Sequence, residues 1–490
     1  MRELLNIAGP VGTAWLILDW IIRIVALFVV PRNRKPTAGM AWLLFIFFFP
    51  TLGFLLFLVL GNPKLPARRR AAQKTLDTVV QKLLAELKRH DTQKLLSAKP
   101  PEEYKALATL SQSLTGLPVF DGNKVDILPE YDNVAPRMVR DVDAAEHYVH
   151  VEFFIVAIDD YTLPLFDAFA RAVQRGVTVR VLYDTVATHM FPRWRDMIKR
   201  LEADGVHVQA MLPLRLPGKG YTRPDLRNHR KLLIVDGRVG YTGSLNLIAR
   251  TYHRKDDIYY DELVVRVDGP VVLEMSAVFL TDWHAETGEI LSYKNKLSPA
   301  KLLEKRGSSL AQILPSGSGY EDENNLKLFT SLLHQAQHTI TIVNPYFIPD
   351  DALTNAITSA AKRGVTVTII NSEAMDQWMV GHAQRSFYDV FLSAGVRVYL
   401  YNAPILLHSK FMVIDNKIAT VGSSNLDLRS FTLNMEVTFT CYDPAVAKKL
   451  QAVADDCLTR SHPLHLHTWR KRPRRQQLGE NIARLTSALQ

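Results

Sequence analysis

Two copies of one pattern of polar residues stand in distant parts of the chain. The first copy is His229-Arg-Lys231-Leu-Leu-Ile-Val-Asp236, and the second is His408-Ser-Lys410-Phe-Met-Val-Ile-Asp415. In each copy one residue separates His from Lys, four residues lead to Asp, and six more lead to a Gly-Ser-x-Asn sequence. A single His-x-Lys arises readily in a basic strand, whereas two copies that share every spacing are very improbable by chance. The pair therefore marks the candidate catalytic site.

The residue types in this duplicated pattern suit chemistry at a phosphodiester. One histidine can attack phosphorus to give a covalent phospho-histidine, while the other protonates the leaving alcohol and then deprotonates the incoming one. The lysines and the asparagine amides can stabilise charge on the non-bridging oxygens, so the chemistry requires neither a metal nor another cofactor. The phosphate-binding and supporting residues predicted from the Gly-Ser-x-Asn sequences are Ser244, Asn246, Ser423 and Asn425.

Four acidic residues accompany the two motifs. Asp236 and Asp415 end the motif strands, where we expect them to orient and charge-balance the lysines and histidines. Glu262 and Glu436 follow each motif on a later strand, where a carboxylate could hold a motif histidine through its second ring nitrogen. A surface or ion-paired carboxylate explains either glutamate equally well.

Length and charge define the classes of protein and partner to be considered. The chain has 490 residues, enough for two or three domains, and a formal net charge of +10. Such a charge favours an anionic partner, which includes nucleic acid, phosphorylated substrates and an anionic membrane surface. Cys441 and Cys457 are the only cysteines, so we expect two buried free thiols and no disulfide framework.

The N-terminal region contains two apolar stretches, 8–30 and 39–60. A transmembrane helix needs about 20 apolar residues, and each stretch supplies them. In the first, Asp19 and Arg23 can pair on one helix face, although they are also compatible with a shorter helix at the membrane interface. Pro50 is tolerated in membrane helices, so the second stretch is predicted to be one continuous span. The flanking positive charges weakly favour a cytoplasmic main body.

Beyond residue 117 the chain repeats an order of strand, helix and strand in two halves. The sequence QRGVTV at 174–179 in the first half matches KRGVTV at 362–367 in the second. Each glycine is expected to end a helix, and the valines that follow begin a strand. These units predict an α/β fold, with two α-β-α sandwich domains, a mostly parallel sheet and a pseudo-twofold axis that brings both motifs to one cleft.

The predicted organisation has five parts. They are a two-helix transmembrane hairpin (1–65), a juxtamembrane helical linker (66–117), two sandwich domains (118–300 and 301–468) and a basic C-terminal tail or helix (469–490). Trp469 lies beside a basic run, which indicates contact with the membrane surface. Metal binding by the nearby histidines is disfavoured, because no cysteine or acidic ligand accompanies His462, His465 and His467.

The duplicated motif resembles the signature of the phospholipase D superfamily, His-x-Lys-x4-Asp. A closer similarity, over nearly the whole chain, is to bacterial cardiolipin synthases of the phospholipase D type. It rests on the apolar hairpin and on four sequences, NHRK at 228–231, YTGS at 241–244, NPYFIP at 344–349 and NLDLRS at 425–430. The resemblance implies that two phosphatidylglycerols give cardiolipin and glycerol at the bacterial inner membrane. It also implies that His229 is the nucleophile and His408 the acid and then the base.

Several alternatives stay open at the level of the sequence. The near symmetry of the motifs allows the two histidine roles to be reversed, and the motif specifies a phosphodiester but not whether water or another alcohol accepts it. The basic segment at 212–227 suits either a solvated loop or a wall for an anionic head group. A nuclease of the same superfamily would suit the charge, but the apolar hairpin and the lack of a recognised nucleic-acid-binding module disfavour it. A non-catalytic scaffold would leave the duplicated spacing unexplained. The expected partners are therefore phosphatidylglycerol and anionic membrane lipids, and not nucleic acid.

Overall fold

The computed structural model describes residues 9–32, 34–62, 64–72, 74, 100–215, 221–253, 257–291 and 299–485. Most of the predicted juxtamembrane helix lies outside these residues. Contacts divide the chain into two units, which are described one at a time. The first unit contains Met1–Leu65 and Arg215–Pro224, and the second contains Pro66–Leu214 and Asp225–Gln490.

The first unit holds three apolar helices, α2 (Gly9–Val29), α3 (Pro36–Phe48) and α4 (Pro50–Leu60). Among helices in the described part of the chain, α2 alone is long and apolar enough to cross a membrane, over Gly12–Val29. The prediction of one continuous helix over 39–60 is wrong. Pro50 has no N–H, and its ring disfavours the helical conformation for the residue before it; Phe49 accordingly has φ −131° and ψ 72°.

Helices α3 and α4 fold back on each other as an antiparallel hairpin. Gly53 permits the close approach, because a Cβ atom at this position would lie 2.9 Å from Cα of Ile46. Further from the turn, the rings of Trp42 and Phe57 meet edge to face at 5.5 Å. At ~1.5 Å per residue the two helices are about 20 and 16 Å long, so neither can cross a hydrocarbon layer of about 30 Å.

The end of α4 is held by the basic segment that precedes the first motif. Tyr221 and Arg223 donate hydrogen bonds of 3.0 and 2.6 Å to the carbonyl groups of Val59 and Leu60. Carbonyl groups in the last turn of a helix have no partner within the helix, so these side chains cap α4. Tyr221 and Arg223 therefore belong to the apolar unit and not to the sandwich.

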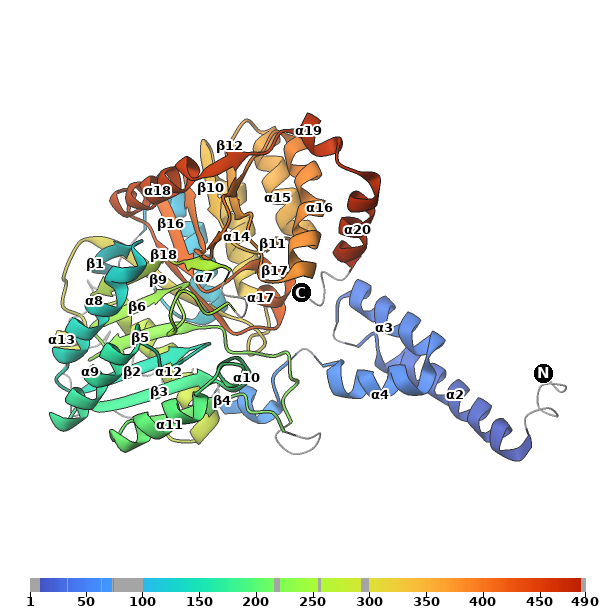
Figure 1. The fold of residues 1–490 in the computed structure, drawn as a ribbon, viewed down its shortest axis with the longest axis horizontal. Coiled ribbons are helices and arrows are strands. Elements are labelled where there is room, and N and C mark those ends of the chain that lie inside the picture. The colour runs from blue at the N-terminus through green and yellow to red at the C-terminus, as the bar shows by residue number, and fades with distance from the viewer. Residues whose placement is uncertain are drawn as a thin grey trace. The chain divides into compact units, whose positions relative to one another are not determined.

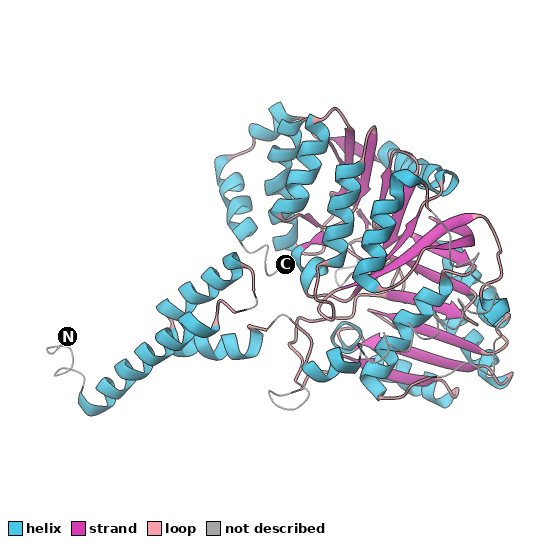
Figure 2. Ribbon diagram, turned by 180° about the vertical axis from the view of Figure 1, so that it is seen from behind, coloured by secondary structure: helices cyan, strands magenta, loops and turns pink. Residues whose placement is uncertain are grey.

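The second unit is a three-layer α-β-α sandwich with helices on both faces of its sheet (Figures 1 and 2). The sheet has 15 strands in the order β19-β13-β12-β10-β15-β16-β18-β9-β1-β8-β6-β5-β2-β3-β4. Strands β9 and β1 pair near its centre and join the two halves into one sheet. Two small pairs, β11 with β17 and β14 with β7, lie outside it.

The elements of the first half are β1 (Phe120–Leu128), α8 (Tyr131–Asp143), β2 (Tyr148–Phe153), α9 (Leu163–Gln174), β3 (Thr178–Asp184), α10 (Thr185–His189), α11 (Trp194–Ala203), β4 (His207–Met211), β5 (Lys231–Val235), β6 (Val239–Gly243), β7 (Tyr259–Asp261), β8 (Val264–Asp268), α12 (Val272–Thr287) and α13 (Pro299–Leu302). A short 3-10 turn (Glu102–Tyr104) and α7 (Lys105–Thr115) precede them.

The elements of the second half are β9 (Ser309–Ser316), α14 (Asn324–Gln335), β10 (Thr339–Val343), β11 (Phe347–Ile348), α15 (Asp351–Lys362), β12 (Thr366–Ser372), α16 (Trp378–Ala394), β13 (Arg397–Tyr401), β14 (Ile405–Leu407), β15 (Phe411–Ile414), β16 (Ile418–Gly422), β17 (Leu426–Asp427), α17 (Leu428–Thr432), β18 (Glu436–Cys441), α18 (Pro444–Thr459), β19 (Ser461–Pro463), α19 (Leu466–Arg470) and α20 (Arg474–Leu485).

One buried apolar core runs under both halves. It contains residues of α12 and α18 together with alternate residues of the strands, such as Leu232 and Ile234 of β5. The residues between them, Leu233 and Val235, belong to a separate core with α8, α9 and α11. Because side chains alternate between the faces of a strand, Lys231 shares its face with Leu233. Strand β5 is thus buried on both faces, and its packing determines the direction in which the side chain of Lys231 leaves the strand.

The prediction of a mostly parallel sheet is wrong, although the α/β class and the two halves are present. Strands β2, β3 and β4 run parallel to one another, as do β10, β12 and β13. The motif strands β5 and β15 pair antiparallel with both of their neighbours. Tight turns follow both motif strands, and a tight turn can connect only antiparallel strands.

Both ends of the second unit also differ from the prediction. Helix α7, expected in a linker, buries Leu107 in the core of the second half. Trp469, expected at the membrane surface, is only 6 % exposed and packs on Tyr388, with the Arg472 guanidinium 3.4 Å from its ring centroid. Cys441 and Cys457 are buried free thiols, as predicted.

Candidate active site

The chain just before each motif histidine pairs with the other half of the molecule. The backbone N–H of His229 donates to the carbonyl of Met435 at 2.9 Å, and that of His408 donates to Asp261 at 2.7 Å. Strand β14, which ends one residue before His408, runs parallel to β7 of the first half. These pairings bring both motifs to one site at the junction of the halves.

Each motif histidine contacts the glutamate of the opposite half. Nδ1 of His229 lies 3.0 Å from both carboxylate oxygens of Glu436, and Nδ1 of His408 lies 2.8 and 2.9 Å from those of Glu262. All four side chains are buried. A carboxylate on Nδ1 fixes the ring and leaves Nε2 directed elsewhere. The glutamates therefore occupy the position expected for them, but the sequence did not indicate that they are exchanged between the halves.

The serines of the Gly-Ser-x-Asn sequences support these glutamates. Ser423 donates a short hydrogen bond to Glu436 and accepts one of 3.0 Å from the N–H of Val437. Ser244 accepts a hydrogen bond of 2.9 Å from the N–H of Leu263, and its hydroxyl helps to lower the pKa of Glu262. The serines thus support the glutamates that hold the two histidines.

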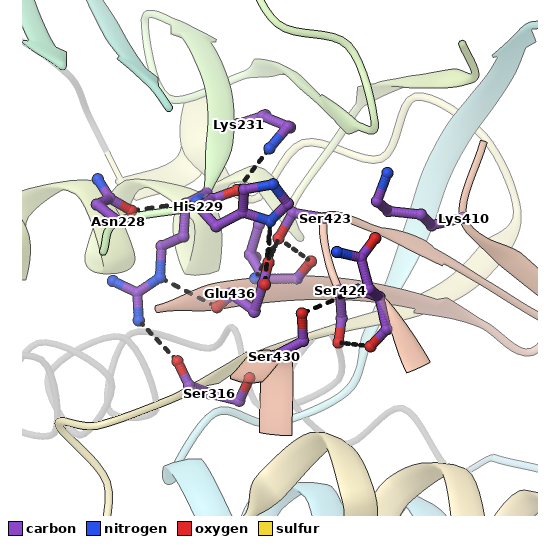
Figure 3. Close-up of polar contacts among 12 residues, drawn as sticks. Asn228, His229, Lys231, Ser316, Lys410, Ser423, Ser424, Ser430 and Glu436 are labelled. Carbon is purple, nitrogen blue, oxygen red and sulfur yellow. Dashed lines mark hydrogen bonds and ion pairs between the residues drawn. The ribbon is translucent and has the colours of Figure 1, made fainter. Parts of the chain in front are cut away.

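The two lysines are buried and have the same local geometry. Nζ of Lys231 donates to the carbonyl of His229 at 2.8 Å, and Nζ of Lys410 donates to that of His408 at 2.7 Å. Figure 3 shows Lys231, Lys410 and Glu436 around the ring of His229. An ammonium has three donors, so each lysine can also bind an anionic oxygen. Burial lowers the pKa of Lys231 to about 7 and that of Lys410 to about 8.

Both motif asparagines present a buried polar atom that could bind a ligand. The side-chain Oδ1 atoms of Asn246 and Asn425 are buried and have no hydrogen-bond partner among the described residues. Because amide oxygen and nitrogen are interchangeable by a flip, either end of each side chain could meet a phosphate or a hydroxyl. An orphaned polar atom is costly to bury, which favours a ligand at this position.

The motif aspartates do not have the role expected of them. The carboxylate of Asp236 accepts hydrogen bonds of 2.8 Å from three successive backbone N–H groups, at residues 146–148. Asp415 accepts three of 2.7 to 2.8 Å at residues 337–339. Both residues have positive φ, 51° and 52°, in the turns after β5 and β15. They stand at the far end of the motif strand from its lysine, so we assign them to the turn and not to the chemistry.

The electrostatic surroundings of the two histidines are unequal. Burial lowers the pKa of His229 well below its usual value, and Lys231 and Lys410 lower it further. Burial also lowers the pKa of His408, but the charge of Glu262 opposes that effect. Burial raises the pKa of Glu436, whereas His408 and Lys410 outweigh burial at Glu262 and hold its pKa low. His408 is therefore the more readily protonated of the pair.

Residues behind the first motif form a charged network that the sequence did not reveal. Arg230 forms a buried ion pair with Asp282 of α12, and Asn228 donates to Glu152 at 2.9 Å. In the second motif Ser409 takes the place of Arg230. A cavity of about 650 Å³ lies there, lined by Glu262, Leu407, Ser409, Asp456 and Arg460. In the sequence, the only sign of this difference between the two motifs is the residue between His and Lys, which is Arg230 in the first motif and Ser409 in the second.

Comparison with known protein families identifies the same two halves and the apolar N-terminal region. A family model described as cardiolipin synthase, PLD-like domain, matches residues 138–283 and 329–458, and one described as phospholipase D-nuclease N-terminal matches residues 13–62. The chain belongs to the cardiolipin synthase family of the phospholipase D superfamily. The family's duplicated domains correspond to the two halves of the sandwich.

Full-length relatives and one solved structure support this membership. The chain is 32 % identical to the cardiolipin synthase of Alkalihalophilus pseudofirmus, over 98 % of this chain and 94 % of that protein. It is 30 % identical to cardiolipin synthase A of Klebsiella pneumoniae, over 96 % and 98 %. The crystal structure of phosphatidylserine synthase from Haemophilus influenzae superposes with a TM-score of 0.60 at 16 % identity, over 78 % of this chain and 99 % of that one, which shows a shared fold.

Replacement of Asp236 by alanine should destabilise the protein without removing a catalytic group. Three backbone N–H groups would lose their acceptor, which we expect to lower the free energy of unfolding by about 3 kcal/mol. Asp236→Asn should cost less, because asparagine tolerates positive φ and retains an acceptor. Denaturant unfolding measures the loss. A stable Asp236→Ala protein with no turnover would instead place the carboxylate in the chemistry.

The buried lysines should set the alkaline side of the pH–rate profile. Protonated lysine binds the phosphate, so kcat/KM should fall as the pH rises above 7 to 8, the range of the two pKa values. Lys231→Arg removes the lower pKa, since guanidinium stays charged, and should move this limb upward by up to about one pH unit, at some cost in rate. Lys417→Arg, which alters an exposed lysine paired with Glu103, is the matched control. An unmoved limb in Lys231→Arg would contradict the assignment.

Proposed function

We propose that this protein transfers the phosphatidyl group of one phosphatidylglycerol to the head group of a second, giving cardiolipin and glycerol. The observation that carries the proposal is the pair of exchanged histidine–glutamate contacts, with a buried lysine beside each. Such a site supplies a nucleophile, an acid–base group and cationic donors for a phosphodiester. Family membership supports a phospholipid substrate.

In the first step Nε2 of His229 attacks phosphorus while the bond from phosphorus to the glycerol oxygen breaks. The imidazolium of His408 gives its proton to that oxygen, and glycerol leaves. A lowered pKa keeps the His229 imidazole neutral and nucleophilic, while the Glu262 carboxylate stabilises the imidazolium of His408. This inequality supports His229 as the nucleophile, an assignment that the symmetrical spacing alone left open.

In the second step neutral His408 removes a proton from a hydroxyl of the second phosphatidylglycerol. That oxygen attacks phosphorus, the bond to His229 breaks, and His408 is again protonated. In both transition states Lys231 and Lys410, with the amides of Asn246 and Asn425, stabilise the charge on the non-bridging oxygens. The residues proposed to touch the reacting phosphate are thus these four and the two histidines.

Because the two histidines have different roles, variants of His229 and His408 should differ in whether they can form the covalent lipid adduct. His229→Ala should lose cardiolipin formation and give no covalent lipid adduct. His408→Ala should also lose turnover, by a factor of about 10² to 10⁴. Given a lipid phosphodiester with an acidic phenol as leaving group, which needs no general acid, His408→Ala should accumulate a phosphatidyl-enzyme. Acid quenching followed by mass spectrometry of the protein detects it.

His284→Ala, at a half-buried histidine of α12 outside the site, is the control for this experiment and should behave as the wild type. An adduct in His229→Ala but not in His408→Ala would reverse the two roles. Cardiolipin made at a near-normal rate by either variant would exclude the two-histidine mechanism. Release of free phosphatidic acid by the wild type without cardiolipin would identify hydrolysis in its place.

We propose that the N-terminal region crosses the membrane once, and not twice as its hydrophobicity alone predicts. Helix α2 can cross a bilayer, whereas α3 and α4 are each too short and form a hairpin that returns to the side it entered. Arg32, Arg34 and Lys35 before the hairpin and the basic group after it (Lys64, Arg68, Arg69 and Arg70) then lie on one side. The positive-inside rule makes that side cytoplasmic, together with the catalytic body.

This arrangement places the N-terminus on the side opposite the catalytic body, because only one span separates them. A fusion of a periplasmically active reporter to the N-terminus should be active, while the same reporter at the C-terminus should be inactive. Two complete spans predict equal results at both ends. Proteolysis of inside-out and right-side-out vesicles provides the corresponding measurement on the unfused protein.

A further inference from the structure

Two tyrosines and a carboxylate outside the motifs flank His408. The hydroxyl of Tyr346 donates to one carboxylate oxygen of Asp376 at 2.7 Å, and that of Tyr260 donates to the other at 3.1 Å. The two rings face the imidazole of His408 edge-on, with centroid separations of 6.2 and 5.5 Å. Tyr260 and Tyr346 are 2 % and 7 % exposed, and Asp376 is half-buried. The cluster joins three separate segments of the chain at the acid–base histidine.

The cluster continues to one of the motif asparagines. The ring of Tyr252 stacks on that of Tyr260 at 3.9 Å and nearly parallel, and the side chain of Asn246 is near enough to lower the pKa of the Tyr252 hydroxyl, although burial raises that pKa overall. A set of phenol, carboxylate and amide groups therefore extends from Asn246, which is proposed to donate a hydrogen bond to the phosphate, to Asp376. Burial raises the pKa of Tyr260 and Tyr346, so both hydroxyls stay protonated and can keep donating to Asp376.

Among the residues that the structure describes, the other half forms no such cluster beside His229. The parallel pairings Val156↔Leu247 and Phe347↔Leu426 make Ile155 the counterpart of Tyr346. The exchanged glutamates likewise make Asn434 the counterpart of Tyr260. The ring that meets His229 edge-on is that of Phe154, at 4.8 Å. The phenol and carboxylate groups of the cluster at His408 are thus not repeated at the counterpart positions Ile155 and Asn434.

We infer that Tyr260, Tyr346 and Asp376 form a subsite for the hydroxyl groups of a neutral polyol, which is the glycerol head group of the leaving and accepting alcohols. The inference rests on the proposed function, in which both alcohols must meet His408. A carboxylate that accepts two phenol hydrogen bonds retains lone pairs for substrate hydroxyls. Its negative charge also disfavours anionic head groups at this position.

A subsite of this kind makes the enzyme prefer glycerol to alcohols with a single hydroxyl. A site built to hydrogen-bond a hydroxyl discriminates against an analogue that lacks it, because the site's own polar groups are left unpaired. Chemistry at phosphorus does not depend on the additional hydroxyls. Loss of the subsite should therefore change which alcohol is accepted more than the rate at which phosphorus reacts.

The test is a competition between two acceptors in the full-length protein. Phosphatidylglycerol vesicles are incubated with labelled glycerol and ethanol, and the ratio of labelled phosphatidylglycerol to phosphatidylethanol is measured. Asp376→Asn and Tyr346→Phe should each lower this ratio by about ten-fold or more. The first step, in which glycerol leaves the donor lipid, is common to both products, so any loss of rate there cancels in the ratio. The matched controls are Asp389→Asn, on the surface of α16, and Tyr388→Phe, in the core beside it.

An unchanged ratio of labelled phosphatidylglycerol to phosphatidylethanol in both variants would overturn the subsite. This holds if both products fall together, which is the result expected of a purely structural role. It also holds if neither product falls. A lowered ratio in the two control variants as well would overturn it in the same way. If the wild type forms neither product and no cardiolipin, the proposed function itself fails. The two failures are distinguishable, because the subsite is judged on a ratio within active protein.

Discussion

The exchanged contact between histidine and glutamate is the interaction on which the rest of the structure depends. His229 and Glu436, and likewise His408 and Glu262, come from different halves and meet at hydrogen-bond distance inside the protein. A buried carboxylate without a partner is costly, so neither half could keep its glutamate alone. The single sheet, joined at β9 and β1, and the core shared by α12 and α18 hold the halves in the register that these contacts require. The duplication is therefore one site in two parts and not two sites.

Within this symmetrical frame, the side chains around the histidines make the site directional. Arg230 forms a buried ion pair with Asp282 beside the first motif, whereas Ser409 of the second motif lines a cavity. Phe154 meets one histidine, and Tyr260 with Tyr346 meets the other. The same motif consequently has different proton affinities and different polarity on its two sides. A transfer reaction needs this difference, because one histidine must remain an unprotonated nucleophile while the other exchanges a proton with each alcohol.

The apolar unit shows how one residue can change a topology inferred from hydrophobicity. The stretch at 39–60 has the length and composition of a span, and only the conformation at Phe49 and Pro50 divides it. Gly53 then allows the two short helices to pack against each other, and Tyr221 and Arg223 cap the second. The segment that caps α4 ends shortly before His229, so the chain leads directly from the apolar unit into the first motif.

The sequence by itself determined the candidate site, the α/β class, the two halves and the apolar N-terminus, because each follows from spacing within a short segment. The repeated spacing of His, Lys and Asp selected the two motifs without knowledge of the fold. Only the tertiary structure decided which glutamate serves which histidine, since that depends on contacts between residues about 150 to 200 positions apart. It also decided that Asp236 and Asp415 hold turns, because a spacing repeated within the chain does not reveal where a carboxylate points. The inequality of the histidines and the tyrosine–aspartate cluster arise from burial and from segments that no local pattern connects.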